Sequence, residues 1–264
     1  MPELPEVASF RKYFEKTAMD RQIAFARVKN AKILRGVSPA GLEEQLSGSR
    51  FKSTRQHGKY LFAALDTGKW LVMHFGMTGF LEYLEDSNRE PAYSRLLIGF
   101  TEGGALAYVN QRMLGWVGIA KHTEEVIEAK KLGPSALDSR LDFEVFRKRL
   151  SGKKSRIKSA LMDQEIVAGI GNVYSDEILF QARLHPDTRV SVLDDSQVKD
   201  IFTKMREVLA TAVKRDADVS RLPENYLLPN RNKKGACPIC GTNWKTMKLG
   251  GRTAYFCPKC QKKN

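Results

Sequence analysis

Cys237-Pro238-Ile239-Cys240 and Cys257-Pro258-Lys259-Cys260 are two CxxC motifs near the end of this 264-residue sequence, and they contain all four of its cysteines. A CxxC motif directs two thiolates at one metal ion, and two motifs complete a tetrahedral zinc site with four cysteine ligands. Four protein ligands leave no open coordination position, so we expect one Zn2+ with a structural role. The alternative is two disulfides, which intracellular proteins seldom use. Residues 235–264 are therefore predicted to form a small zinc-binding module.

Basic residues are concentrated around this module and in one further cluster. After Glu224 the chain has no acidic residue but nine Lys or Arg, and residues 147–158 contain seven basic residues. Arg252 follows Gly250-Gly251, which predicts a guanidinium at the tip of a hairpin. The formal net charge of +14 favours a polyanionic partner, most commonly nucleic acid. A single charged run is usually a solvated face, and composition leaves an anionic membrane surface or a ribosomal role open.

The first half of the chain consists of short β-rich runs separated by turn signals. The predicted strands are residues 23–34, 59–65, 70–75, 80–84, 96–100, 105–109 and 116–122. Such punctuated strands indicate a β-sandwich or barrel. Pro5 and Glu6 suit the first turn of a helix, and Val7, Phe10 and Phe14 continue it at helical spacing.

Helical periodicity replaces the strand pattern after Gly133-Pro134. The predicted helices are residues 143–150, 155–162, 172–182 and 196–214. We predict an α+β multidomain protein with an N-terminal β-sandwich and flanking helices, a helical domain and a C-terminal zinc finger with four cysteine ligands. The expected domain boundaries are residues 1–130, 131–225 and 226–264.

The sequence contains no targeting or membrane signal that we recognise. The acidic, proline-bearing start is not a signal peptide, and the apolar stretches are too short to span a bilayer. We expect a cytoplasmic protein, associated with the nucleoid if it is bacterial.

Ala168-Gly169-Ile170-Gly171-Asn172 precedes a predicted helix and can form an anion cradle. Glycines before a helix expose backbone N–H groups, and the helix N-terminus adds positive potential. Asn172 supplies a side-chain amide at the same end. Most Gly-x-Gly turns only reverse the chain, so this motif alone is a weak signal.

Pro2 is small enough for Met1 to be removed, which would leave a secondary amine at the chain terminus. Ordinary processing without function is the usual outcome. Here the amine would lie beside a helix N-terminus, which favours its neutral form, and Glu3 and Glu6 supply carboxylates for proton transfer. Attack of such an amine on a sugar C1′ gives an iminium that acidifies C2′ and promotes elimination of the 3′ phosphate.

Five stretches together resemble the formamidopyrimidine-DNA glycosylase and endonuclease VIII family. They occur in the family's order and span nearly the whole chain: Pro2-Glu3-Leu4-Pro5-Glu6-Val7, His57-Gly58-Lys59-Tyr60-Leu61, His74-Phe75-Gly76-Met77-Thr78-Gly79, Ala168-Gly169-Ile170-Gly171-Asn172-Val173-Tyr174 and the four-cysteine finger.

The resemblance implies a bifunctional DNA glycosylase and abasic-site lyase with a helix–two-turn–helix domain as its second part. It would bind double-stranded DNA containing damaged bases or abasic sites in a cleft between its domains, as a monomer. The implied catalytic residues are the nucleophile Pro2, the acid/base Glu3, the phosphate-binding Lys59 and the supporting Glu6. The implied DNA contacts are His74, Met77, Arg112, Leu114, Asn172 and Arg252, and the zinc ligands are Cys237, Cys240, Cys257 and Cys260. A base must leave the duplex before it can react, so an enzyme of this kind has to hold the backbone on both sides of it.

Two departures from the formamidopyrimidine branch concern the choice of lesion. The branch reads Asp-Pro-Arg-Arg-Phe-Gly where this chain reads Asn110-Gln111-Arg112-Met113-Leu114-Gly115, so Leu114 replaces an aromatic wedge while Arg112 remains. Residues 215–236 lack the usual Gly- and Thr-rich loop that caps the lesion.

Two other functions are compatible with parts of the pattern. A catalytically silent member of the family would bind damaged DNA without cleaving it. A small-molecule enzyme could use an N-terminal proline as a base, but it would need neither the zinc finger nor the basic tail.

Overall fold

The computed structural model describes residues 1–86, 89–232 and 234–263. The chain forms two compact units. Unit 1 contains Met1–Pro2 and Glu6–Lys130, and unit 2 contains Glu3–Pro5 and Lys131–Asn264. Helix α1 (Leu4–Ala18) therefore begins with residues that pack in unit 2 and continues in unit 1.

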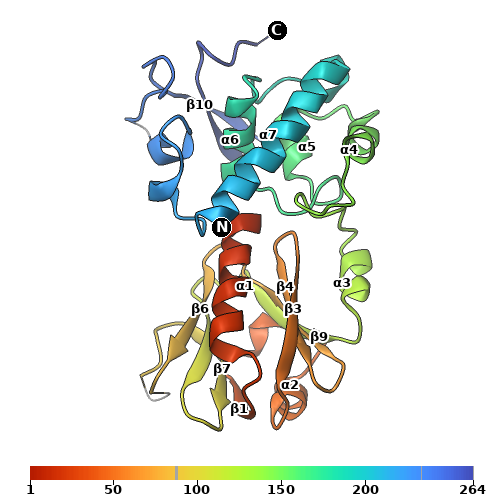
Figure 1. The fold of residues 1–264 in the computed structure, drawn as a ribbon, viewed down its shortest axis with the longest axis vertical. Coiled ribbons are helices and arrows are strands. Elements are labelled where there is room, and N and C mark those ends of the chain that lie inside the picture. Colours follow the sequence, from red (N-terminus) through yellow and green to blue (C-terminus); the bar gives the residue numbers. More distant parts are fainter. Residues whose placement is uncertain (87–88, 233, 264) are drawn as a thin grey trace. The chain divides into compact units, whose positions relative to one another are not determined.

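Unit 1 is built on two sheets (Figure 1). The four-stranded sheet has the order β1-β7-β8-β6, and the five-stranded sheet has the order β2-β9-β5-β4-β3. The strands are β1 (Ile23–Val28), β2 (Leu34–Arg35), β3 (Phe51–His57), β4 (Tyr60–Leu65), β5 (Trp70–His74), β6 (Gly79–Leu84), β7 (Ser94–Phe100), β8 (Ala105–Asn110) and β9 (Trp116–Ala120). All pairings are antiparallel except the short β2–β9 pair.

One apolar core joins the two sheets and α1. Ile98 of β7 and Leu71 of β5 belong to the same buried cluster as Phe14 of α1. The α1 stripe predicted from the sequence faces this core, and the Phe14 and Phe51 rings meet edge to face at 4.9 Å. The predicted β-sandwich is confirmed. Helices α2 (Pro39–Leu46) and α3 (Thr123–Ala129) complete unit 1.

The strand prediction was wrong at two places in unit 1. The predicted strand 23–34 ends at Val28, and a 3-10 turn (Ala31–Ile33) follows, capped by the Asn30 side chain. Strand β3 was missed because only its two terminal residues are fully buried. Its middle, Lys52-Ser53-Thr54-Arg55-Gln56, is polar, so it has no apolar alternation to reveal it.

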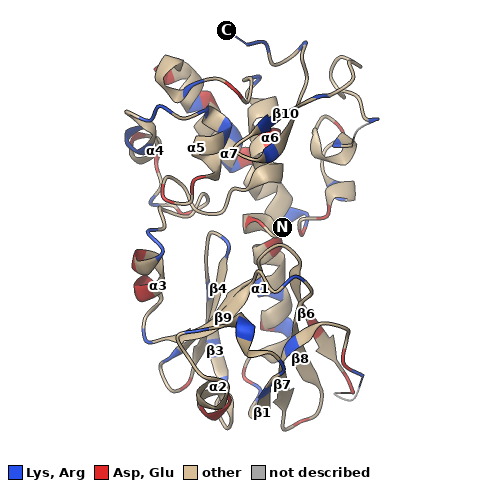
Figure 2. Cartoon of the chain, turned by 180° about the vertical axis from the view of Figure 1, so that it is seen from behind, with Lys and Arg blue, Asp and Glu red and all other residues tan. Residues whose placement is uncertain are grey.

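The described residues from Lys131 onward form four α-helices and a two-stranded hairpin in unit 2. They are α4 (Phe143–Leu150), α5 (Ile157–Met162), α6 (Asn172–Gln181), α7 (Asp195–Lys214), β10 (Lys245–Leu249) and β11 (Arg252–Phe256). Helix α7 begins with a capping box, in which Asp194 and Gln197 satisfy each other's backbone N–H groups. Figure 2 shows basic residues gathered on α4. In the described part of the chain, no helix is both long and apolar enough to cross a membrane.

Candidate functional site

The N-terminus of α6 holds the carboxylate of Glu3. The Glu3 side chain accepts hydrogen bonds from the backbone N–H groups of Gly171 (2.6 Å), Val173 (2.8 Å) and Tyr174 (3.2 Å). Because Gly171, the N-cap residue, offers no side chain, the carboxylate satisfies donors that the helix leaves open. The predicted anion cradle therefore exists, but its ligand is a carboxylate of the same chain and not a free phosphate.

Glycine is required at position 171 because Glu3 lies against it. A Cβ atom built on Gly171 would stand 2.5 Å from Cδ of Glu3, well inside van der Waals contact. The Glu3 side chain is only 1% exposed. Its carboxylate is thus fixed by three donors and by close packing.

Asn172 connects the first turn of α6 to the finger hairpin. Its Nδ2 donates to the carbonyl of Thr253 in β11 at 3.2 Å, while its buried Oδ1 has no partner among the described residues. Arg252 precedes Thr253 and is exposed at the start of β11. The structure therefore brings Glu3, Asn172 and the Arg252 strand to one end of α6.

Arg252 stands beside the tight turn of the hairpin. Leu249 pairs with Arg252, and Gly250 and Gly251 between them have φ angles of 54° and 73°. Two successive positive φ angles form a type I′ turn, which suits glycine and matches strand twist. The hairpin tip predicted from the sequence is confirmed, and its guanidinium faces solvent.

A buried ionic network ties the same hairpin to the helices of unit 2. Asp176 accepts from Nζ of Lys158 at 2.6 Å and from Nη2 of Arg231 at 2.7 Å. The Tyr255 N–H of β11 donates to the same carboxylate at 3.2 Å. The side chains of Asp176 and Lys158 are 0% and 1% exposed.

Asp176→Asn should destabilise unit 2 by about 3–5 kcal/mol, because it leaves Lys158 charged, buried and without its counter-ion. Urea unfolding followed by far-ultraviolet circular dichroism measures the change. Glu207→Gln is the matched control, since its pair with Lys204 is half exposed and should contribute less than about 1 kcal/mol. Equal losses in the two variants would contradict this role of the network.

The four cysteines lie in the geometry of a metal site. Their sulfurs are within 4.8 Å of one another, with Sγ–Sγ distances of 3.8 Å for Cys237–Cys260 and 3.5 Å for Cys240–Cys257. A disulfide needs about 2.05 Å. Four thiolates about 2.3 Å from a tetrahedral ion lie about 3.8 Å apart. The residues present therefore fit a structural metal ion.

Lys59 lies in the two-residue turn between β3 and β4, beside His74 of β5. The strand predicted from Lys59 begins one residue later, and Lys59 is buried, at 7% exposure. Burial and the charges of Lys59 and Lys130 lower the pKa of His74 to about 4. Nδ1 of His74 accepts from the Gly76 N–H at 3.4 Å. The neutral ring is thereby left with Nε2–H as its donor.

Two adjoining loops of unit 1 present Met77, Arg112 and Leu114. Met77 is 39% exposed and Leu114 is 53% exposed, which is high for apolar side chains of their size. The Arg112 N–H donates to Oγ1 of Thr78 at 3.3 Å. Asn110 connects the two loops through hydrogen bonds of its side chain.

Asn110 is fully buried, and its amide donates to the Phe75 carbonyl (3.2 Å) and the Tyr108 hydroxyl (2.9 Å). An ionised aspartate could make neither bond as a donor. Asn110, which stands where the branch has Asp, thus holds the two loops together through hydrogen bonds that its amide donates.

Apolar residues of the stretch 219–231 pack into unit 2. Leu222, Leu227 and Leu228 belong to its buried core. Glu177 accepts from the Leu227 and Leu228 N–H groups at 3.2 and 2.8 Å, and burial raises its pKa to about 7. Part of the stretch 215–236, where no capping loop is expected, is thus anchored on α6.

Pro2 and Glu6 are both half-buried and belong to unit 1, whereas Glu3 belongs to unit 2. The predicted site residues are therefore divided. Unit 1 contains Pro2, Glu6, Lys59, His74, Met77, Arg112 and Leu114, and unit 2 contains Glu3, Asn172, Arg252 and the four cysteines.

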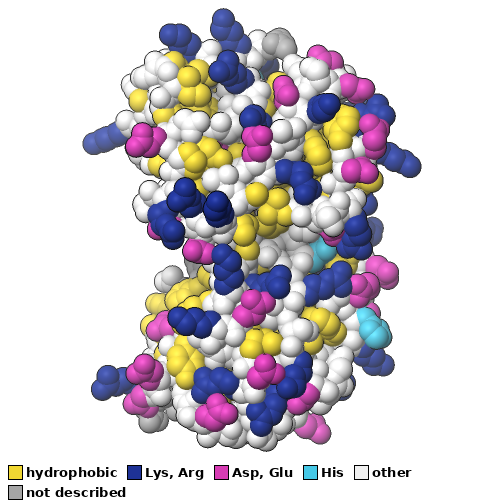
Figure 3. All heavy atoms as spheres, in the orientation of Figure 1, with side chains coloured by type: hydrophobic (Ala, Val, Ile, Leu, Met, Phe, Trp, Pro, Cys, Tyr) yellow, Lys and Arg dark blue, Asp and Glu magenta, His cyan; other side chains and the backbone are white. Residues whose placement is uncertain are grey.

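Sequence reasoning missed the residues that support the site. Lys158 was counted in a basic surface cluster, but it is buried on Asp176. Asp176 and Glu177 are consecutive acids in a helix that continues Ile178-Leu179-Phe180, and charges inside so apolar a helix were the available signal. Figure 3 shows Lys and Arg among Asp, Glu and apolar side chains on one face, so net charge alone does not locate a site there.

Family models match three consecutive parts of the chain. They are the formamidopyrimidine-DNA glycosylase N-terminal domain (residues 1–117), the formamidopyrimidine-DNA glycosylase H2TH domain (residues 132–224) and the zinc finger found in FPG and IleRS (residues 236–263). The H2TH match confirms the helix–two-turn–helix domain implied by the resemblance.

Curated relatives and solved structures agree with these matches. The formamidopyrimidine-DNA glycosylase of Rippkaea orientalis is 34% identical, with 99% of this chain and 100% of the relative covered. That of Arabidopsis thaliana is 32% identical over 99% of this chain and 71% of the relative.

Two solved structures of similar proteins contain DNA. The Lactococcus lactis enzyme non-covalently bound to DNA with an AP site has a TM-score of 0.90 and 26% identity, with 99% of this chain and 100% of that chain covered. A MutM complex with DNA containing carbocyclic 8-oxo-G has a TM-score of 0.89, 27% identity and the same coverage. With three matched domains in order and a relative 34% identical that is covered over its whole length, the chain belongs to the formamidopyrimidine-DNA glycosylase family, whose members are DNA glycosylases with AP lyase activity.

Proposed function

We propose that this chain excises oxidised or ring-opened bases from double-stranded DNA and then cleaves the strand at the abasic site. The observation that carries the proposal is the Glu3 carboxylate fixed on α6. Glu3 follows Pro2 in the chain, and its carboxylate accepts from Gly171 and Val173, the two neighbours of Asn172. The enzyme acts as a monomer in the cytoplasm, on the nucleoid if it is bacterial.

The proposed nucleophile is the secondary amine that removal of Met1 exposes on Pro2. Its nitrogen attacks C1′ while the bond from C1′ to the base breaks, and the base leaves with a proton. Opening of the sugar gives an iminium between Pro2 and C1′, with Glu3 as the acid/base that serves the sugar oxygen. Loss of a C2′ proton expels the 3′ phosphate, and a second elimination expels the 5′ phosphate. Glu6 supports the site.

The proposed DNA contacts divide into phosphate binding and filling of the stack. Lys59, the neutral His74 through Nε2–H, Asn172 and Arg252 bind phosphates around the extruded nucleotide. Met77 and Leu114 fill the space that the base leaves, and Arg112 hydrogen-bonds the unpaired base of the other strand. Their exposure supports these roles, because a structural role would bury the apolar pair.

The proposed metal is one structural Zn2+ on Cys237, Cys240, Cys257 and Cys260. When bound, it holds the finger folded and takes no part in the reaction. The hairpin that carries Arg252 depends on this module, so the ion serves DNA binding indirectly.

Arg252→Ala should weaken binding to duplex DNA with a tetrahydrofuran abasic analogue and reduce the slope of log Kd against log salt by about one unit. The reason is the loss of one released counterion. Fluorescence anisotropy over a series of salt concentrations measures it. Lys214→Ala, an exposed change at the end of α7, is the control and should leave the slope unchanged. An unaltered slope for Arg252→Ala would mean that its guanidinium binds no phosphate.

Oxidised pyrimidines, ring-opened bases and abasic sites should be cleaved faster than 8-oxoguanine opposite cytosine. Leucine at position 114 stacks less well than phenylalanine, and the stretch 215–236 lacks the Gly- and Thr-rich capping loop and is held at Leu227 and Leu228 by Glu177. Competitive cleavage of matched duplexes, each carrying one lesion, tests the order. A tenfold preference for 8-oxoguanine would overturn our interpretation of both features.

A catalytically silent binder is the second candidate. In this alternative the proposed DNA contacts are the same, but Pro2 does not react with the sugar. Binding without cleavage of any of these duplexes would favour it.

A further inference from the structure

Three lysines of the basic cluster 147–158 have no ion-pair partner in the described part of the chain. Four of its seven basic residues are engaged, since Arg147 binds Glu144 and Asp195, Arg149 binds the Glu165 carbonyl, Arg156 binds Asp187 and Lys158 binds Asp176. Lys148, Lys153 and Lys154 remain. The DNA contacts proposed above use none of them.

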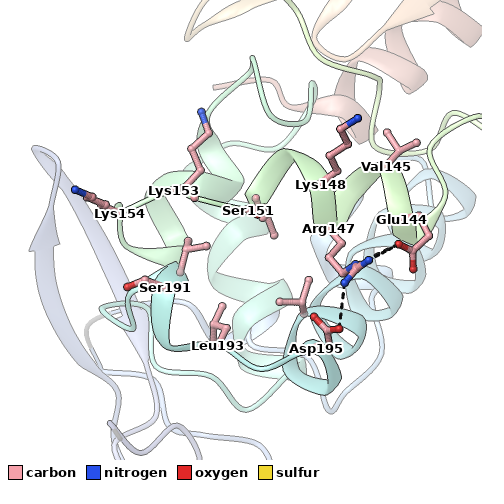
Figure 4. Close-up of a pocket in the computed structure, with 14 residues that line it drawn as sticks. Glu144, Val145, Arg147, Lys148, Ser151, Lys153, Lys154, Ser191, Leu193 and Asp195 are labelled. Atoms are coloured by element: carbon pink, nitrogen blue, oxygen red, sulfur yellow. Dashed lines mark hydrogen bonds and ion pairs between the residues drawn. The ribbon is translucent and has the colours of Figure 1, made fainter.

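These three lysines line one pocket of unit 2, which we call the α4–α7 pocket (Figure 4). It has a volume of about 810 Å³ and lies among α4, the loop after it, residues 190–193 and the start of α7. Its apolar lining residues are Val145, Leu150, Val190, Leu193 and Val198. A pocket of this size accommodates a drug-sized ligand or two to three side chains.

On one side of the pocket an ion pair links α4 to α7. Arg147 extends from α4 to Glu144 (2.7 Å) and across to Asp195 of α7 (3.2 Å), as the dashed lines in Figure 4 show. These are the two acidic residues that line the pocket, and the single charge of Arg147 offsets one of their two negative charges. With Lys148, Lys153 and Lys154 the lining therefore keeps an excess of positive charge for an incoming ligand.

The three lysines extend away from the pocket, whose lining also includes the five apolar side chains. In Figure 4, Lys148 and Lys153 extend outward from the same side, and Lys154 extends from the loop that follows α4. A ligand bound in the pocket would have apolar contacts at its centre and positive charges at its edge. This order is typical of a protein interface, where an apolar centre is surrounded by a polar rim.

We propose that the α4–α7 pocket binds an acidic segment of a partner protein, with one or two apolar side chains inserted and carboxylates against Lys148, Lys153 and Lys154. A DNA backbone fits less well, because sugar and phosphate offer little to cover five apolar side chains. The inference is independent of the proposed glycosylase activity, since it shares no residue with it.

The probe is a fluorescein-labelled peptide Asp-Asp-Asp-Leu-Phe, titrated with the full chain and followed by anisotropy. We expect saturable binding, and none for Ser-Ser-Ser-Leu-Phe or Asp-Asp-Asp-Ser-Ser, because the pocket requires both charge and apolar contact. Lys153→Glu with Lys154→Glu should weaken binding by at least about tenfold, as two attractions become repulsions. The control is Lys199→Glu with Lys214→Glu, two exposed changes outside the pocket, which should leave the affinity within about twofold.

A second variant tests the apolar lining without unfolding α4. Val145 is 37% exposed in the first turn of that helix, where a carboxylate is favourable, so Val145→Glu should fold normally and abolish peptide binding. Affinity for abasic DNA should be the same in the Lys153/Lys154 variant and its control. Absence of peptide binding at millimolar concentration, or a selective loss of DNA affinity in the Lys153/Lys154 variant, would overturn the proposal.

Discussion

Borohydride should trap a covalent protein–DNA adduct when the chain without Met1 meets a duplex containing an abasic site, and retention of Met1 should abolish the adduct. The physical reason is the state of one nitrogen. In the processed chain the Pro2 nitrogen is a basic secondary amine, whereas after Met1 it is a tertiary amide with no lone pair available for attack. We expect strand cleavage to fall by at least about 10³-fold, a modest figure for the loss of a nucleophile.

Binding must be measured beside cleavage to interpret that result. The form that retains Met1 should still bind tetrahydrofuran DNA, because Lys59, Asn172 and Arg252 are unchanged. Pro2→Gly in the processed chain should also lose most of the adduct, since a primary amine gives a neutral imine that must be protonated before it is as reactive as the charged iminium of proline. No adduct from the processed chain would favour the silent binder, and an adduct that survives with Met1 in place would move the nucleophile to another residue.

Cys257→Ser should release one equivalent of zinc and weaken binding to abasic DNA by about 100-fold or more. Metal binding supplies much of the folding free energy of so small a module, on the order of 10 kcal/mol in isolated fingers. Without the metal, the β10–β11 hairpin no longer holds Arg252 beside its turn, and the hydrogen bond from Asn172 to the Thr253 carbonyl is lost. Atomic absorption measures the metal, and anisotropy measures binding.

Lys259→Gln is the matched control for the zinc prediction. Lys259 lies inside the second CxxC motif but is exposed and contributes no ligand, so the variant should keep its zinc. Full DNA affinity in a Cys257→Ser protein shown to contain no zinc would exclude the role that we assign to the finger.

Local patterns predicted the elements in which buried and exposed side chains alternate at regular helix or strand spacing. Helix α4 was expected at the bounds that it has, because Phe146 and Leu150 form a regular buried stripe and Asp142 caps it. Strand β3 was invisible because its polar middle hides it. The CxxC spacing predicted the cysteine cluster without any knowledge of the rest of the fold, since two short loops suffice to bring the four sulfurs together.

What local patterns could not predict are contacts between residues far apart in the chain. The bond from Gly171 to Glu3 joins residues that are 168 positions apart, and the bond from Arg231 to Asp176 joins residues 55 apart. Lys158 is chemically the same as its neighbours Lys153 and Lys154. Only the fold distinguishes the buried lysine from the two that face solvent.

The Glu3 carboxylate has a consequence for the entropy of the chain terminus. The first residues of a protein usually fray, and a terminal amine then samples a large volume. Here Glu3 is held by three N–H donors, so the Pro2 nitrogen, which removal of Met1 would make the terminal one, lies one residue from a side chain fixed on α6. The effective concentration of this nitrogen near one point on α6 is therefore raised during folding. The N-terminal residues lose their conformational entropy at that stage, before any substrate binds. A glycine inside the chain, whose missing Cβ makes room for a carboxylate, thus restricts through that carboxylate the motion of the N-terminal residues.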